Sequence, residues 1–123
     1  MSIFSGNVAR FDLGTSELSF QPLADYRQQV GGRGVNQHIL LREMPRGRTA
    51  LDPEVLLALG AGLLAGTDAP GACRLNADSL NPLTGGIGSG NCGGFVAGEL
   101  RAAGVPHLIL RGRAPRLSYL LVE

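Results

Sequence analysis

Residues 60–104, GAGLLAGTDAPGACRLNADSLNPLTGGIGSGNCGGFVAGELRAAG, decide how this chain folds and what it can bind. Glycine occupies 12 of these 45 positions, far above its average use of about 7%. The glycines gather in two clusters, 60–71 and 85–94, separated by turn-forming Asn, Asp, Ser and Pro. Such density is needed where the backbone takes positive φ or where a ligand approaches it closely. We predict that both apply and that the ligand carries phosphate; tight turns between strands are the alternative.

Size and composition limit the class of protein. A chain of 123 residues forms one domain. The net charge of +1 argues against a general role on nucleic acid or acidic membranes. Cys73 and Cys92 form no CxxC pair, so we expect buried free thiols and neither a disulfide framework nor zinc or iron–sulfur ligands. The N-terminus lacks a signal-like apolar segment, and the longest apolar run, 55–59, is too short to cross a bilayer. We expect a cytoplasmic protein.

Apolar residues that recur every two positions predict strands, and those that recur every three to four positions predict helices. Alternation predicts a β-hairpin from 8–13 and 17–20, around a turn at 14–16. Helices are predicted over 23–30, 35–44 and 95–103, the second with its apolar stripe interrupted by Asn36. Strands are predicted over 55–59 (with a helix as the alternative), 73–77, 108–110 and 117–122. The fold class expected is α+β: a β-rich single domain with two or three short helices.

One motif in the second glycine cluster matches the spacing of a dinucleotide-binding motif but lacks its sequence context. Residues 88–93, GSGNCG, satisfy GxGxxG, and a helix is predicted shortly afterwards. A dinucleotide-binding motif should follow a strand and precede an acidic residue by about twenty positions. Here a turn, 81–85, is predicted before the motif, and Glu99 is too near while Glu123 is too far. We therefore reject a Rossmann fold, and the absence of Lys excludes a Walker phosphate loop.

A set of short motifs, in order, is similar to the N-terminal domain of the aldehyde ferredoxin oxidoreductase family, which are tungsten or molybdenum pterin enzymes. The motifs are GRG at 32–34, AGLLAGT at 61–67, AP at 69–70 followed by Arg74, PLTG at 82–85, NCGG at 91–94, GELRAAG at 98–104 and GRA at 112–114. The resemblance spans residues 1–123 and covers a little over the first half of the family's cofactor-binding domain. It implies the fold of that domain.

The resemblance also implies a site. In the family, glycine-rich loops hold two pterins whose phosphates share a magnesium ion. The position of Asn91 lends its main-chain carbonyl to the magnesium, Gly93 and Gly94 give close backbone access to a pterin, and Arg74 contacts the phosphate or pterin. Arg33, at a glycine-rich helix entry, is a further candidate. Magnesium prefers hard oxygen ligands, and Arg is a natural bidentate partner of phosphate. The implied cofactors are tungstopterin or molybdopterin with magnesium.

The family's iron–sulfur cysteines and its acid and base residues fall beyond this sequence. We therefore expect no catalytic residue and no iron–sulfur ligand in residues 1–123. Three hypotheses follow. The chain holds pterin while a larger catalytic subunit supplies the cluster; or two copies form a homodimer around one magnesium; or the chain is a non-catalytic binding module that takes another anion, such as a nucleotide. No nucleic-acid or membrane partner is expected.

Four other polar residues are expected to have structural roles. His38 and His107 lack a partnered Asp or Cys motif, so a surface or structural histidine is expected at each. Asp68 lies in a predicted turn and suits an Asx-turn. Glu99 falls on the apolar side of its predicted helix, where a structural hydrogen bond or an Arg pair is expected.

Overall fold

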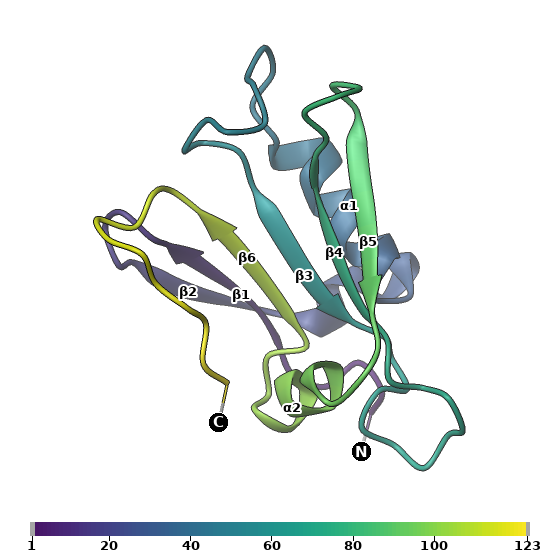
Figure 1. Ribbon diagram of the computed structural model, residues 1–123. Helices are drawn as coiled ribbons and strands as arrows, with labels where there is room; N and C mark the ends of the chain where they lie inside the picture. The colour runs from purple at the N-terminus through teal and green to yellow at the C-terminus, as the bar shows by residue number, and fades with distance from the viewer. Residues whose placement is uncertain (1, 123) are drawn as a thin grey trace.

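The computed structural model describes residues 2–122 and shows one mixed β-sheet with helices on both faces (Figure 1). The described strands are β1 (Asn7–Asp12), β2 (Leu18–Pro22), β3 (Leu57–Ala61), β4 (Leu75–Leu80), β5 (Ile87–Cys92) and β6 (His107–Arg111). The helices are the 3-10 helix η1 (Leu23–Gln29), α1 (Arg33–Glu43) and α2 (Val96–Ala102).

The sheet has the strand order β2-β1-β6-β3-β4-β5. Strands β1 and β6 pair in parallel, and the other four neighbouring pairs are antiparallel. The parallel pair joins the N-terminal hairpin to the antiparallel unit made by β3, β4 and β5. The glycine-rich stretch 60–104 therefore begins at the end of β3 and supplies β4 and β5, with β5 at the edge of the sheet.

Each face of the sheet has its own apolar cluster. The helices η1 and α1 cover one face, where the cluster includes Val8, Leu23, Tyr26, Val35, Ile39, Leu40, Leu56, Ala58 and Ile109. The short α2 covers part of the other face, with Ala61, Ala65, Leu75, Ala97 and Leu100. Because a strand directs successive side chains to opposite faces, β3 contributes Ala58 to the first cluster and Ala61 to the second. Aromatic residues are few, so aliphatic packing supplies most of the buried surface.

The predicted α+β fold class is confirmed, and so are the N-terminal hairpin, the three helices and a strand at 108–110. Two predicted strands lie a few residues later than expected, at β3 and β4. Two other differences are larger. No strand was predicted at 88–93, yet this motif falls largely within strand β5. Residues 117–122 form no strand, because the sheet offers them no ladder partner within residues 2–122.

A buried amide joins α1 to the sheet. Asn36, fully buried, donates from Nδ2 to the carbonyls of Ala58 (3.2 Å) and Asn76 (3.4 Å) and to Oδ2 of Asp78 (2.8 Å). Its Oδ1 lies 2.9 Å from Nδ1 of His107. Because an amide oxygen only accepts, His107 must carry its proton on Nδ1. Asn36 therefore links α1 to β3, β4 and β6.

Gly60 makes room for this network. A Cβ at this position would lie 2.5 Å from Oδ1 of Asn36 and 2.7 Å from the His107 ring. Burial, with a smaller contribution from the charge of Arg101, lowers the pKa of His107 to about 4. His107 is thus a structural histidine, which agrees with the sequence prediction. His38 packs edge-on against Tyr26, with ring centroids 6.0 Å apart.

The buried histidine predicts a pH dependence of stability. In the unfolded chain His107 takes up a proton near pH 6.5, whereas in the fold it stays neutral until about pH 4. The free energy of unfolding should therefore be highest above pH 6.5. It should fall as the pH drops toward 4, by up to about 3 kcal/mol. Urea unfolding at pH 7.5, 6, 5 and 4.5 measures this. His107→Gln should flatten the slope in that window, and an unchanged slope would contradict the assignment.

Candidate functional site

The β3–β4 loop and the end of β5, both rich in glycine, lie at the same end of the sheet (Figure 1). We call this the glycine-rich end: the start of α1, the β3–β4 loop (62–74) and the residues that follow β5 (93–95). Gly32 packs against Gly62, and Gly66 packs against Gly98 of α2. The amide of Gly62 donates to the carbonyl of Arg74 at 3.2 Å, which closes the β3–β4 loop. Segments up to sixty residues apart in sequence are thus held in one place.

Two of the predicted site residues are in contact there. Oδ1 of Asn91, on β5, accepts from Nδ2 of Asn76 at 2.7 Å and from Nη2 of Arg33 at 3.4 Å. Asn76 lies directly opposite Asn91 in the β4–β5 ladder. The guanidinium of Arg33, in the first turn of α1, is therefore held beside the end of the edge strand.

The other three predicted residues adjoin the same two strands: Arg74 directly precedes β4, and Gly93 and Gly94 directly follow β5. The β4–β5 pairing ends at Leu75 and Cys92, so Arg74 and Gly93 are the next residues of their strands. Arg74 is exposed, and within residues 2–122 its side chain takes part in no hydrogen bond or ion pair. No atom lies within 4 Å of a Cβ built on Gly93 or Gly94, and Gly94 has φ of +103°.

This arrangement suits an anionic group. Two arginines flank the end of β5, where bare backbone is open to a ligand. The first turn of α1 contains no acidic residue, and its cap Gly32 makes no side-chain hydrogen bond, so the positive end of the helix is not neutralised. Guanidinium groups and free amides are strong donors to phosphate oxygens. A pterin phosphate fits these residues chemically, and a main-chain carbonyl on the edge strand is a hard oxygen ligand of the kind that magnesium takes.

A shallow hollow of about 460 Å³ adjoins this end, lined in part by Gly66, Gly71, Cys73, Gly94 and Phe95.

The prediction of buried cysteines was wrong: Cys73 and Cys92 are both exposed. They lie on the two strand ends that frame the site, where packing against the core is absent. Phe95 is 88% exposed, so the buried side of α2 is smaller than predicted and consists of Ala97 and Leu100.

Two predicted structural roles also differ. Glu99 is exposed and makes no side-chain hydrogen bond or ion pair within residues 2–122, because α2 turns Ala97 and Leu100 to the sheet. In the turn at 66–70, Thr67 takes the role expected of Asp68. Its hydroxyl donates to the carbonyl of Leu64 at 2.6 Å and accepts from the amide of Ala69 at 3.3 Å.

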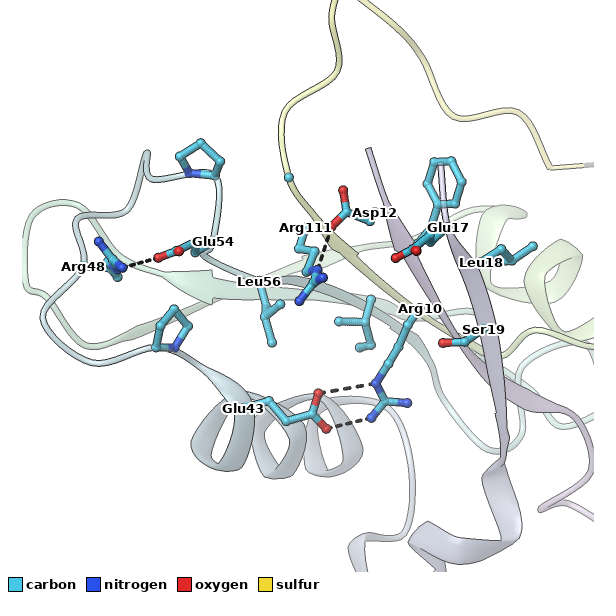
Figure 2. Close-up of a pocket in the computed structure, with 15 residues that line it drawn as sticks. Arg10, Asp12, Glu17, Leu18, Ser19, Glu43, Arg48, Glu54, Leu56 and Arg111 are labelled. Atoms are coloured by element: carbon cyan, nitrogen blue, oxygen red, sulfur yellow. Dashed lines mark hydrogen bonds and ion pairs between the residues drawn. The ribbon is translucent and has the colours of Figure 1, made fainter. Parts of the chain in front are cut away.

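A larger cavity, of about 1090 Å³, lies at the opposite end of the sheet (Figure 2). Arg10 extends from β1 to Glu43 of α1, with 2.7 Å between Nη2 and Oε1, and this bond raises the pKa of Arg10. Arg111 pairs with Asp12 at 2.8 Å. The backbone amides of Thr15 and Gly14, and then Arg111, lower the pKa of Asp12.

Arg48 pairs with Glu54 across the same cavity. Each of its three arginines is thus already matched by a carboxylate, and the charges satisfy one another across β1, β6 and α1. This cavity therefore suits an anion less well than the glycine-rich end, although its volume is more than twice that of the hollow there.

Sequence reasoning missed Asn76, which positions the side chain of Asn91, and Asn36, which anchors the carbonyl of Asn76. One signal was present: Asn36 breaks an otherwise apolar helical stripe, and a polar residue at a core position is expected to have buried hydrogen-bond partners. Asn76 carries no such signal, because alternation in a strand leaves open which face is buried.

Within residues 2–122, no group of three or more His, Cys, Asp and Glu side chains is arranged to hold a metal ion. Among the helices that the structure describes, none has the length and apolar character to cross a membrane.

The fold defines a mixed-sheet domain with glycine-rich turns and two arginines at one end, and sequence comparison identifies its class. The sequence model for the aldehyde ferredoxin oxidoreductase N-terminal domain matches residues 8–123. The chain belongs to this family, as the order of its glycine motifs predicted.

Its relatives are much longer proteins. The chain is 32% identical to the tungsten-containing aldehyde ferredoxin oxidoreductase of Pyrococcus furiosus and 31% identical to that of Thermococcus kodakarensis, each over 120 residues. Both matches cover 96% of this chain and 20% of the relative. Among solved structures, a chain of the active site complex BamBC of benzoyl coenzyme A reductase, in complex with 1,5-dienoyl-CoA, superposes with a TM-score of 0.89 at 34% identity, over 98% of this chain and 19% of that one. The chain thus spans about a fifth of the length of these proteins.

The contacts of Asn91 predict that its side-chain oxygen stabilises the glycine-rich end. Asn91→Ala removes the acceptor of Asn76, a residue that is only 9% exposed, and of Arg33. It should lower the free energy of unfolding by about 1 kcal/mol because a buried amide loses its partner. Asn91→Asp, the matched control, keeps an acceptor for both donors and should lose less. Urea unfolding of both variants measures the difference, and equal losses would contradict the role of this oxygen.

Proposed function

We propose that this chain is the tungstopterin-binding component of an aldehyde ferredoxin oxidoreductase-type enzyme. Arg74 and Arg33 hold the pterin phosphate, Gly93 and Gly94 admit the cofactor to the backbone, and the main-chain carbonyl of Asn91 ligates a magnesium ion. The tungsten centre, when bound, supplies the redox chemistry; the residues of this chain bind and orient the cofactor. The observation that carries the proposal is the convergence of open glycine backbone and two arginines at the end of β5.

The reaction needs groups that this chain does not contribute. Its two cysteines and two histidines are not arranged as ligands of a metal or cluster within the described residues. The relatives carry the matched region as a fifth of a longer chain. We therefore propose that a larger partner polypeptide supplies the iron–sulfur cluster and the catalytic residues. A homodimer that binds one cofactor between two copies is the alternative assembly.

Gly93 offers a test that separates binding from folding. A side chain at this position meets open space, and its φ is not in the positive region, so Gly93→Val should leave stability within about 0.5 kcal/mol of the parent. It should nevertheless cut tungsten and pterin content at least tenfold, because the side chain fills the space through which the cofactor approaches. Metal analysis and fluorescence of the oxidised pterin, on protein purified from a tungstate-supplied host together with its partner, measure both contents.

Gly86→Val is the matched control. Gly86 also lacks positive φ and meets only an ordinary contact at 3.7 Å, but it lies in the turn between β4 and β5 at the other end of the sheet. The control should retain cofactor. Equal retention by both variants would contradict the proposed site. Thermal stabilisation by nucleotides in the absence of any pterin would instead favour a module that binds another anion.

A further inference from the structure

The face of the sheet opposite α1 carries no charged side chain on the described strands. Arg10 of β1 and Asp78 of β4 both bond to residues of α1, which fixes the side of the sheet to which they belong. Asp12 lies two residues after Arg10 and is paired in register with Arg111. Alternation places all four on the α1 face. These four are the only Asp, Glu, Lys or Arg residues in the six strands.

Strand register collects large apolar residues on the opposite face. Phe11 lies beside Leu18 in β2 and beside Leu110 in β6, and Leu110 lies beside Leu57 in β3. A second row runs parallel to it across the same four strands: Phe20, Ala9, Leu108 and Leu59. We call the surface made by Phe11, Leu18, Phe20, Leu57 and Leu110 the open sheet face. Leu18 is 54% exposed, Phe20 is 56% exposed and Leu57 is 39% exposed.

Little of the chain covers this surface. Helix α2 has seven residues and packs on Ala61 and Leu75, at the end of the face near the glycine-rich turns. The segment that follows β6 runs back toward α2, where Val122 packs against that cluster. This segment adds apolar surface of its own, since Leu117, Tyr119, Leu120 and Leu121 are all more than half exposed.

Such a face is unusual in a sheet that meets water. A half-exposed, mainly antiparallel sheet alternates apolar residues toward the core with polar residues toward solvent. Here the set that faces away from α1 is mainly apolar in β1, β3 and β6, although the charged residues of β1 and β6 lie on the covered α1 face. Large contiguous apolar patches mark interaction surfaces. The sequence thus specifies a sheet with something packed on the open face.

We propose that the open sheet face is the docking surface for the partner polypeptide, the region that makes up the other four-fifths of the longer relatives, through an uncharged apolar surface of that region. The inference rests on the proposed function and specifies its interface. Two observations select this occupant. The relatives carry that region covalently next to a matching domain. The open face also has no charge to complement, so its partner must match it by apolar contact.

Co-purification tests the interface. The probe is the remaining four-fifths of the Pyrococcus furiosus relative, co-expressed with this chain carrying an affinity tag. Leu18→Glu and Phe20→Glu, made separately, place a charge on the open sheet face and should reduce the recovered partner at least tenfold. Leu41→Glu and Leu83→Glu are matched controls, because these leucines are 80% and 94% exposed on α1 and in the β4–β5 turn. Both should recover the partner as the parent does, and circular dichroism checks that all four variants fold.

A measurement on the chain alone keeps the proposal testable if the probe folds poorly. The parent should bind anilinonaphthalene sulfonate, with fluorescence reduced at least twofold in Leu18→Glu and unchanged in Leu41→Glu. The proposal is overturned if the face variants recover partner like the controls, if the dye response ignores Leu18→Glu, or if light scattering shows a dimer of the chain that this substitution splits.

Tungsten content, measured on the same complexes, distinguishes the two proposals. If the complex depends on the open sheet face but holds no tungsten, the proposed cofactor function is contradicted and the proposed interface stands. If the complex holds tungsten and the face variants do not weaken it, the proposed interface is contradicted and the proposed function stands.

Discussion

The side-chain amide of Asn36 is the constraint on which the arrangement of this domain depends. Its nitrogen reaches two main-chain carbonyls and a carboxylate, and its oxygen meets the proton of a buried imidazole. A buried amide with every partner in place specifies one relative position of helix and strands, because any shift leaves polar atoms unpaired at a cost of about 1–3 kcal/mol each. The network is possible only because Gly60 lacks a side chain.

This constraint extends to the glycine-rich end. Asn36 bonds to the carbonyl of Asn76, and the side chain of Asn76 in turn holds Asn91 at the end of the edge strand. Arg33 lies one helical turn before Asn36 and contacts the same Asn91 oxygen. The buried network therefore sets both the position of α1 and the alignment of its first turn with β5. The exposed residues of the glycine-rich end are thereby tied to the buried core.

The two ends of the sheet differ in how their charges are used. In the larger cavity, arginines are matched by carboxylates, and the pairs tie β1 and β6 to each other and to α1. At the glycine-rich end, Arg74 is exposed and Arg33 contacts a neutral amide, so their positive charge is available to a ligand. Positive charge without a carboxylate partner therefore lies at the glycine-rich end and not in the larger cavity.

The sequence predicted the fold class, the hairpin, the helices and the family because these depend on local periodicity and on the order of short motifs. It also singled out Arg33, Asn91 and Gly93, which the structure brings to one end of the sheet. It failed where tertiary pairing decides. Residues 88–93 resemble a phosphate loop, yet pairing with β4 makes them largely strand, and the strand-like 117–122 finds no neighbour. The exposure of both cysteines depends on which strand ends are left uncovered, and no local pattern encodes that.

Titration of the isotopically labelled chain with inorganic pyrophosphate and magnesium, followed by amide NMR shifts, tests the central claim most directly. The account predicts that the shifts concentrate at the amides of residues 33–35 and 92–94 and are lost in Arg74→Ala. Shifts centred on Arg10, Arg48 and Arg111, or no saturable shifts at the glycine-rich end, would contradict it.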